Sequence, residues 1–251
     1  MPKRKLFTKK DVIKLTYSKL DNKKIEIGKG HLESNVNLGK IKFKDKSGRI
    51  ITKKVAIKDF RRDEILNKNN LPSFKKVVND LKNIKLSNGN YLLPKMGFIE
   101  VTDSAGKKHW VQVTEAFVNG GKSKFTENKN LTFDLRSVKQ MLEIMTLLAN
   151  KGYYFPGGVR NNLASFKEHS GVKLLDLEHL PGIYEYKNTT SSMHSLAMIT
   201  YMLNDSLIRH YAKLNKQVNK GRMEKFLINY SLKFIKPELK EEYLQNIEDL
   251  R

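Results

Sequence analysis

The spacing of the apolar residues changes partway along the chain, and this change restricts the fold more than any other feature. Between residues 24 and 117, apolar side chains mostly alternate with polar ones, as they do in half-buried strands. From residue 135 onward they recur every three or four positions, as they do on helices packed against a core. The sequence therefore predicts an α+β protein with a strand-rich first part and a mostly helical second part.

The first part is expected to contain five strands and one helix. The turn sequence Asp45-Lys46-Ser47-Gly48 separates two of the strands. A helix is expected at 74–84, after Pro72 and Ser73, because its apolar residues have helical spacing. The first three strands form a simple antiparallel meander. The five strands are expected at 25–27, 36–43, 50–57, 91–101 and 109–117.

A short helix is also expected before the first of these strands. Thr8 and Asp11 have the spacing of a capping box, and the apolar residues Val12, Ile13 and Leu15 follow at once. The interpretation gives an N-terminal helical extension over residues 1–22.

The second part begins with a long helix over 135–149, which ends at Lys151 and Gly152, a basic last turn followed by a glycine stop. A short hairpin is expected around 172–176. No internal repeat or low-complexity linker interrupts the chain. Further helices are expected at 192–203, 207–214 and 223–234, and from Pro237 to the end.

The chain has a formal net charge of +22, from 48 Lys and Arg against 26 Asp and Glu. Residues 1–100 hold 26 of the basic and 10 of the acidic side chains, so most of the surplus lies in the first part. Lysines greatly outnumber arginines and do not interleave with aromatics, unlike in proteins that read bases. A coding sequence rich in A and T explains the lysines equally well. If they serve binding, the partner is an acidic protein or, alternatively, a nucleic acid.

The chain contains no cysteine, which excludes disulfides, thiolate metal sites and cysteine nucleophiles. No apolar run reaches the roughly 20 residues of a membrane helix, and the N-terminus leads into no apolar signal segment. The histidines are scattered without metal-ligand spacing. We therefore expect a cytoplasmic protein; the basic residues Lys3, Arg4 and Lys5 leave a nuclear location open.

The order of elements, together with Val55-Ala56-Ile57-Lys58 on the third strand, resembles the protein-kinase-like fold. The tetrapeptide matches the family's phosphate-binding lysine motif, in which the lysine neutralises phosphate oxygens. The resemblance extends over residues 23–205. It implies a bilobal fold, with a five-stranded antiparallel N-lobe and one main helix over 23–116. A reduced, mostly helical C-lobe follows over 117–251.

The resemblance implies a nucleotide site in the first part. Gly28 and Gly30 resemble a shortened glycine-rich loop, whose backbone approaches a phosphate because no Cβ intervenes. Lys58 would contact the phosphates. Thr114 resembles the gatekeeper of the hinge, and the stretch from Glu115 to Phe117 would offer backbone groups to an adenine.

The resemblance also implies a metal site in the second part. Asn162 and Asp176 resemble the two metal-binding residues of the family and have about the family spacing. They imply ATP and Mg²⁺ as ligands, because Mg²⁺ prefers oxygen donors. Glu178 follows Asp176 as in choline-kinase-like enzymes and is a further candidate ligand.

Two charged groups of active protein kinases have no counterpart here. The sequence from 151 through 162 contains no carboxylate, and Gly157 stands where the family has its catalytic aspartate. Val77 stands where the family has the helix glutamate that pairs with the strand lysine. Glu64 or Asp80 takes that place only if the alignment is shifted. No catalytic residue is therefore assigned.

These departures predict a pseudokinase, a kinase-like scaffold that retains ATP binding, lacks efficient phosphotransfer and acts by binding a protein or another acidic partner. The first alternative is an atypical ATP-dependent phosphotransferase for a protein or small molecule, because phosphoryl transfer depends mainly on positioning and charge. The second alternative is a polyanion- or nucleic-acid-binding protein.

Overall fold

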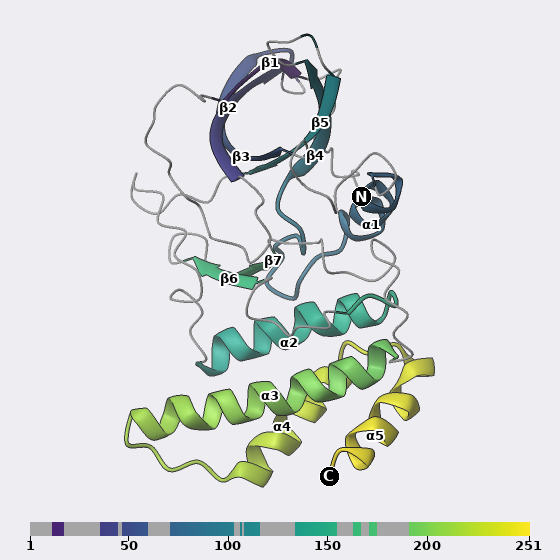
Figure 1. The fold of residues 1–251 in the computed structure, drawn as a ribbon. Helices are drawn as coiled ribbons and strands as arrows, with labels where there is room; N and C mark the ends of the chain where they lie inside the picture. Colours follow the sequence, from purple (N-terminus) through teal and green to yellow (C-terminus); the bar gives the residue numbers. More distant parts are fainter. Residues whose placement is uncertain are drawn as a thin grey trace. The chain divides into compact units, whose positions relative to one another are not determined.

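The computed structural model forms two compact units (Figure 1). The first comprises Met1–Ile84 and Leu93–Glu127, and the second comprises Lys85–Leu92 and Asn128–Arg251. Helices and an antiparallel sheet are both present, which confirms the α+β class. The residues that the structure describes are 12–17, 36–44, 47–59, 71–102, 106, 108–115, 134–154, 163–166, 171–174 and 191–251.

The first unit is built on an antiparallel sheet with the strand order β1-β2-β3-β5-β4, which curls strongly in Figure 1. The chain leaves this sheet after β3, forms α1, and returns at the far edge as β4 before β5 pairs with β3. The strands are β1 (Val12–Tyr17), β2 (Val36–Lys44), β3 (Ile50–Asp59), β4 (Met96–Thr102) and β5 (Lys108–Glu115).

One face of this sheet carries the hydrophobic core of the first unit. Buried side chains from β2, β3, β4 and β5 pack together there, and none is more than 7% exposed. Along β3 they alternate with half-buried or exposed residues, as the two-residue period of a strand requires. The core residues are Ile41, Phe43, Val55, Ile57, Ile99, Val111 and Val113.

The helix expected within the N-terminal extension, residues 1–22, is wrong over 12–17, because Val12–Tyr17 form strand β1. Leu15 pairs with Ile41 and Thr16 with Lys40 of β2, so backbone pairing outweighs the local capping signal. The segment also alternates Ile13, Leu15 and Tyr17 with polar residues, a period that favours a strand. β1 is thus a strand that the sequence analysis did not predict, and the strand expected at 25–27 lies outside the described residues.

Helix α1 (Leu71–Leu81) packs on the face of the sheet opposite the core, which we call the outer face. Its Phe74 ring lies edge-on to Phe98 of β4, with centroids 6.2 Å apart. Its Lys75 ammonium lies 4.0 Å above the ring centre of Trp110 on β5. Pro72 lies in the first turn, where its missing N–H would have no helical partner. The expected helix at 74–84 is therefore confirmed, beginning three residues earlier.

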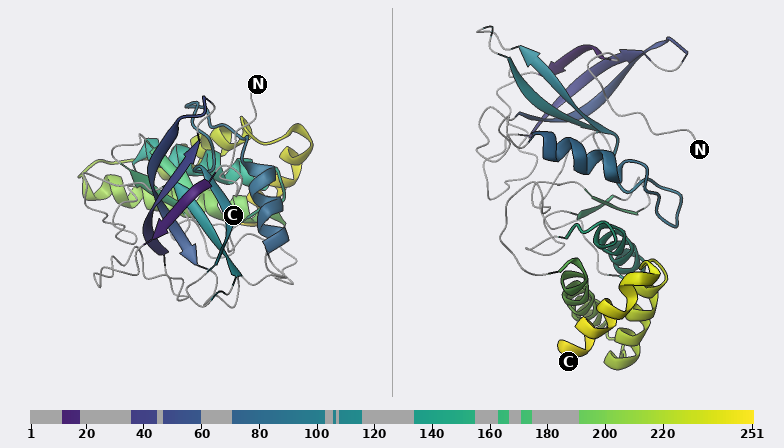
Figure 2. Two further views of the ribbon diagram at one scale, coloured as in Figure 1. Left: turned by 90° about the horizontal axis from the view of Figure 1, so that it is seen from above. Right: turned by 90° about the vertical axis from the view of Figure 1, so that its right-hand side faces the viewer.

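The second unit combines a short hairpin with a group of helices, of which α3 contacts α2, α4 and α5 (Figure 2). The hairpin strand β7 packs against α2, where Val172 and Leu174 are buried. The hairpin strands are β6 (Leu163–Phe166) and β7 (Gly171–Leu174). The helices are α2 (Leu135–Ala149), α3 (Ser192–Lys213), α4 (Lys220–Leu232), η3 (Pro237–Leu239) and α5 (Lys240–Asp249).

The two helices expected at 192–203 and 207–214 form a single helix, α3. α3 continues through 204–206, where a break was expected, because Leu203 and Leu207 lie one turn apart and are both buried. Within the described part of the chain, no helix is long and apolar enough to cross a membrane.

The expected stop of α2 is confirmed. Gly152 has φ of 77°, a left-handed conformation that glycine adopts without steric cost. The N–H of Tyr153 donates to the Leu148 carbonyl, and the N–H of Gly152 donates to the Ala149 carbonyl. Together these two hydrogen bonds form a Schellman motif. At the other end of α2, the Asp134 carboxylate accepts from the Ser137 N–H at 2.7 Å.

A buried carboxylate fastens the segment Lys85–Leu92 to the second unit. Glu143 of α2 is only 2% exposed. It accepts hydrogen bonds from the Ser87 backbone N–H and, at 2.8 Å, from the Ser87 hydroxyl. Ser87 itself is exposed, so the buried partner that depends on these two hydrogen bonds is the carboxylate of Glu143.

We expect Glu143→Ala to lower the free energy of unfolding by about 1.5–3 kcal/mol, because it removes the charged acceptor of two hydrogen bonds. Urea unfolding followed by circular dichroism measures this. Glu241→Ala, at an exposed position on α5, is the control and should shift the free energy by less than about 0.5 kcal/mol. Equal effects of the two substitutions would contradict the anchoring role.

A tyrosine hydroxyl lies in the core of the second unit. Tyr243 of α5 is fully buried, and its hydroxyl lies 3.0 Å from that of Thr200 on α3. Burial raises the pKa of Tyr243 above the ordinary value of 10.0, because ionisation would place a charge in the core.

This raised pKa makes the fold sensitive to alkali. Above pH 10.0 the unfolded chain releases the Tyr243 proton while the folded chain keeps it, so stability falls as the pH rises. We expect Tyr243→Phe to flatten that fall, although it loses one hydrogen bond at neutral pH. Thermal unfolding between pH 8 and 11 measures the slope, and identical slopes for both proteins would contradict the assignment.

Candidate functional site

The outer face of β3 and β5 brings together two of the expected nucleotide-binding residues, Lys58 and Thr114. Lys58 pairs with Gln112, and Ala56 with Thr114, in the register between the two strands. These four side chains alternate with the core residues and therefore share one face. Gln112 donates from Nε2 to the Thr114 hydroxyl at 3.2 Å.

Two cross-strand rows extend this face onto β4. One row runs Lys58, Gln112, Phe98, and the next runs Ala56, Thr114, Met96. Phe98 contacts Phe74 of α1, so the helix covers the β4 end of the row that begins with Lys58.

This face can bind an anion next to a flat, mostly apolar surface. Lys58 is half-buried, so its charge is less screened by solvent than that of a lysine on the open surface. Ala56 carries only a Cβ and is half-buried. Thr114 supplies a hydroxyl whose oxygen already accepts from Gln112. A phosphate beside Lys58 and a planar ring over Ala56 fit this combination of charge and small side chains.

One backbone group of Glu115 already forms a hydrogen bond within the protein. Its N–H donates to the Lys95 carbonyl at 2.7 Å within the first unit. Its side chain follows the alternation of Val111 and Val113 and therefore points to the opposite face from Lys58. Of the groups expected at the hinge, the Glu115 N–H is thus not a donor for a ligand, and its carbonyl stays the candidate.

Helix α1 presents an apolar residue where the kinase-like interpretation expects a carboxylate. Val77 is buried together with Phe74 and Leu81. Asp80, the alternative, is exposed on the helix, and Glu64 lies outside the described residues.

The remaining expected site residues lie outside the part of the chain that the structure describes. Two of them border the described hairpin, however. Asn162 directly precedes β6, and Asp176 follows β7 by two residues, while Leu163 and Leu174 are direct partners at that end of the hairpin. The expected residues that are not described are Gly28, Gly30, Phe117, Gly157, Asn162, Asp176 and Glu178.

Strand β7 of the hairpin is held by a residue that the sequence analysis did not single out. Gln140 of α2 accepts from the Val172 N–H through Oε1 at 2.9 Å. A glutamine on a helix carries no sequence signal for this role. Among the described residues, no three His, Asp or Glu side chains gather as a metal site.

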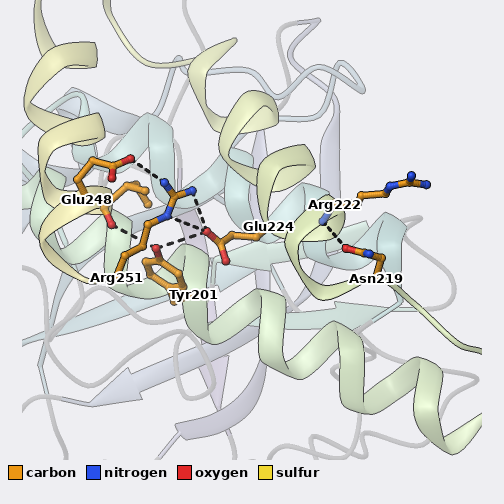
Figure 3. Close-up of polar contacts among 7 residues, drawn as sticks. Tyr201, Asn219, Arg222, Glu224, Glu248 and Arg251 are labelled. Atoms are coloured by element: carbon orange, nitrogen blue, oxygen red, sulfur yellow. Dashed lines mark hydrogen bonds and ion pairs between the residues drawn. The ribbon is translucent and has the colours of Figure 1, made fainter.

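A second polar cluster links the helices of the second unit (Figure 3). Arg251 donates to Glu224 of α4 at 3.1 and 3.2 Å and to Glu248 of α5 at 2.7 Å. Tyr201 of α3 donates to the Ile247 carbonyl at 3.2 Å, and burial raises its pKa, with Glu224 adding to the rise. This cluster joins helix ends and is structural.

No protein-family model matches this chain, and no curated protein matches it significantly. The candidate function therefore depends on the strand order, the register and the residues themselves.

Trp110 is the single tryptophan of the chain, so its fluorescence reports on this face. We expect Lys75→Ala to lower the free energy of unfolding by about 0.5–1 kcal/mol and to change the Trp110 emission, because a cation above the ring is lost. The neighbouring Lys76 is exposed, and Lys76→Ala should leave the emission unchanged. An unaltered spectrum in Lys75→Ala would contradict the contact.

Proposed function

We propose that this protein is a pseudokinase: a protein-kinase-like scaffold that binds ATP on the outer face at Lys58, lacks efficient phosphotransfer and acts by binding an acidic partner. The observation that carries the proposal is the register of β3 with β5, which aligns Lys58 and Ala56 with Gln112 and Thr114. It agrees with the phosphate-lysine and gatekeeper roles that the resemblance implies.

The strand order and the place of α1 support the same proposal. A helix follows the lysine strand, covers the lysine's own face of the sheet, and precedes the edge strand β4. The hairpin β6–β7 supports the metal-site part, since its paired end borders Asn162 and Asp176. An Mg²⁺ held by their oxygens would neutralise phosphate charge.

The missing carboxylates favour a scaffold over an enzyme. Phosphoryl transfer to a hydroxyl uses an aspartate that orients the attacking group. The sequence from 151 through 162 has none, and α1 has the buried Val77 where the lysine's partner is expected. ATP binding needs neither of these carboxylates, since positive charge and an apolar surface for the base suffice.

We expect ATP with Mg²⁺ to raise the unfolding temperature of the protein, by roughly 5–10 °C at a hundredfold excess over Kd, because the ligand binds the folded state alone. Lys58→Ala should remove most of this shift. Lys53→Ala is the matched control: the residue lies exposed on the same strand and should leave the shift intact. Asp176→Ala should remove the dependence on Mg²⁺.

A thermal scan with and without ATP would falsify nucleotide binding if the two curves coincide. Transfer of label from γ-labelled ATP to a protein or small molecule, abolished by Asp176→Ala, would instead identify an atypical phosphotransferase. Binding of a nucleic acid without any response to ATP would support the second alternative.

A further inference from the structure

Three lysines lie together on the outer face of strands β2 and β3, away from Lys58 along the strands. Lys40 and Lys42 alternate with the buried Ile41 and Phe43, and Lys54 alternates with the buried Val55. All three are exposed. Lys40 and Lys54 are direct cross-strand partners. We call Lys40, Lys42 and Lys54 the lysine face.

The arrangement is unfavourable for the isolated chain. Like charges directly opposite each other on neighbouring strands repel. Within the described part of the chain, none of the three lysines forms a salt bridge, and the described outer positions of β2 and β3 hold no carboxylate. In the register between β1 and β2, the backbone of Lys14 is the partner of Lys42. An anionic partner would relieve this repulsion.

The neighbouring residues indicate the chemical class of that partner. Ile50 lies on the same face, two positions before Thr52, and is 63% exposed. An exposed isoleucine beside lysines suits a polypeptide that offers both carboxylates and an apolar side chain. Single-stranded nucleic acids favour aromatic platforms and arginine, and the described outer positions of β2 and β3 hold neither.

We propose that the lysine face binds an extended acidic segment of a partner protein, with carboxylates on the lysines and an apolar side chain on Ile50. Lysines two positions apart on a strand are roughly 6.6 Å apart, the same spacing as alternate side chains of an extended segment. Acidic residues at every second position of that segment can therefore meet Lys40 and Lys42 in succession. This inference assigns a surface to the partner-binding part of the proposed function, and it does not depend on nucleotide binding.

The test uses the full chain and a short fluorescein-labelled peptide in which Glu alternates with Thr and one Leu ends the segment. Fluorescence anisotropy measures its affinity at low and at physiological salt. The triple variant Lys40→Glu, Lys42→Glu, Lys54→Glu should bind about tenfold more weakly or worse, because attraction becomes repulsion. The control triple Lys213→Glu, Lys216→Glu, Lys225→Glu makes the same charge change at exposed positions on α3, on α4 and between them and should bind within about twofold of wild type.

Equal losses in the two triple variants would show attraction by net charge alone and would overturn the proposal. Tighter binding of a single-stranded or duplex oligonucleotide of equal charge, lost in the lysine-face triple, would assign the surface to a nucleic acid and overturn it as well. The lysine-face triple should keep the wild-type response to ATP, so failure of this proposal and failure of nucleotide binding are distinguishable.

A folding measurement tests the repulsion itself. Lys40→Glu places a carboxylate opposite Lys54, so it should raise the urea midpoint above that of wild type. The double variant Lys40→Glu, Lys54→Glu restores like charges and should return toward the wild-type midpoint. A decrease in Lys40→Glu would show that the two lysines do not repel each other and would overturn the basis of the proposal.

Discussion

Strand β3 imposes the constraint on which the first unit depends. It pairs with β2 on one side and β5 on the other, so both halves of the sheet take their register from it. Its side chains alternate between a buried face, with Val55 and Ile57, and the outer face, with Lys54 and Lys58. A shift of one residue would bury the lysines and expose the core, which makes the register strongly specified. The same alternation that builds the core therefore also positions every charged group discussed for this unit.

The outer face divides into two regions of different character. Near Lys58 it is partly covered by α1 and bordered by Phe98 and Trp110. Near Lys40 and Lys54 it is open to solvent. Charge on a half-covered surface suits a small anion, which needs a close and poorly screened contact, whereas charge on an open surface suits a long and extended one. One sheet face can in this way serve two ligands of different size.

The sequence was most informative where a single period continues over many residues. The helix at 135–149 and the strands at 36–44 and 50–59 follow the expected pattern, because burial on one face requires it. The errors lie where local signals compete with pairing or packing. At β1, pairing with β2 outweighed a capping signal, and in α3 the buried Leu203 and Leu207 carried the helix through a polar stretch. Lys58 and Thr114 were expected from the sequence and lie on one face of the sheet, while their binding of a nucleotide stays a prediction. The hydrogen bonds of Gln140 and of the Glu115 N–H join residues distant in sequence, which no local pattern reports.

The Glu143–Ser87 contact also means that the second unit is discontinuous in sequence. Its segment Lys85–Leu92 is encoded between α1 and β4, and Leu86 and Leu92 are buried in the folded chain. The polypeptide therefore passes between the two units three times, so no single cut releases either unit with all its residues. A fragment ending near residue 127 would carry away Ser87 and leave the carboxylate of Glu143 buried without these two donors. Separate production of the helical unit therefore has to supply the segment Lys85–Leu92 as well, if Glu143 is to keep its donors.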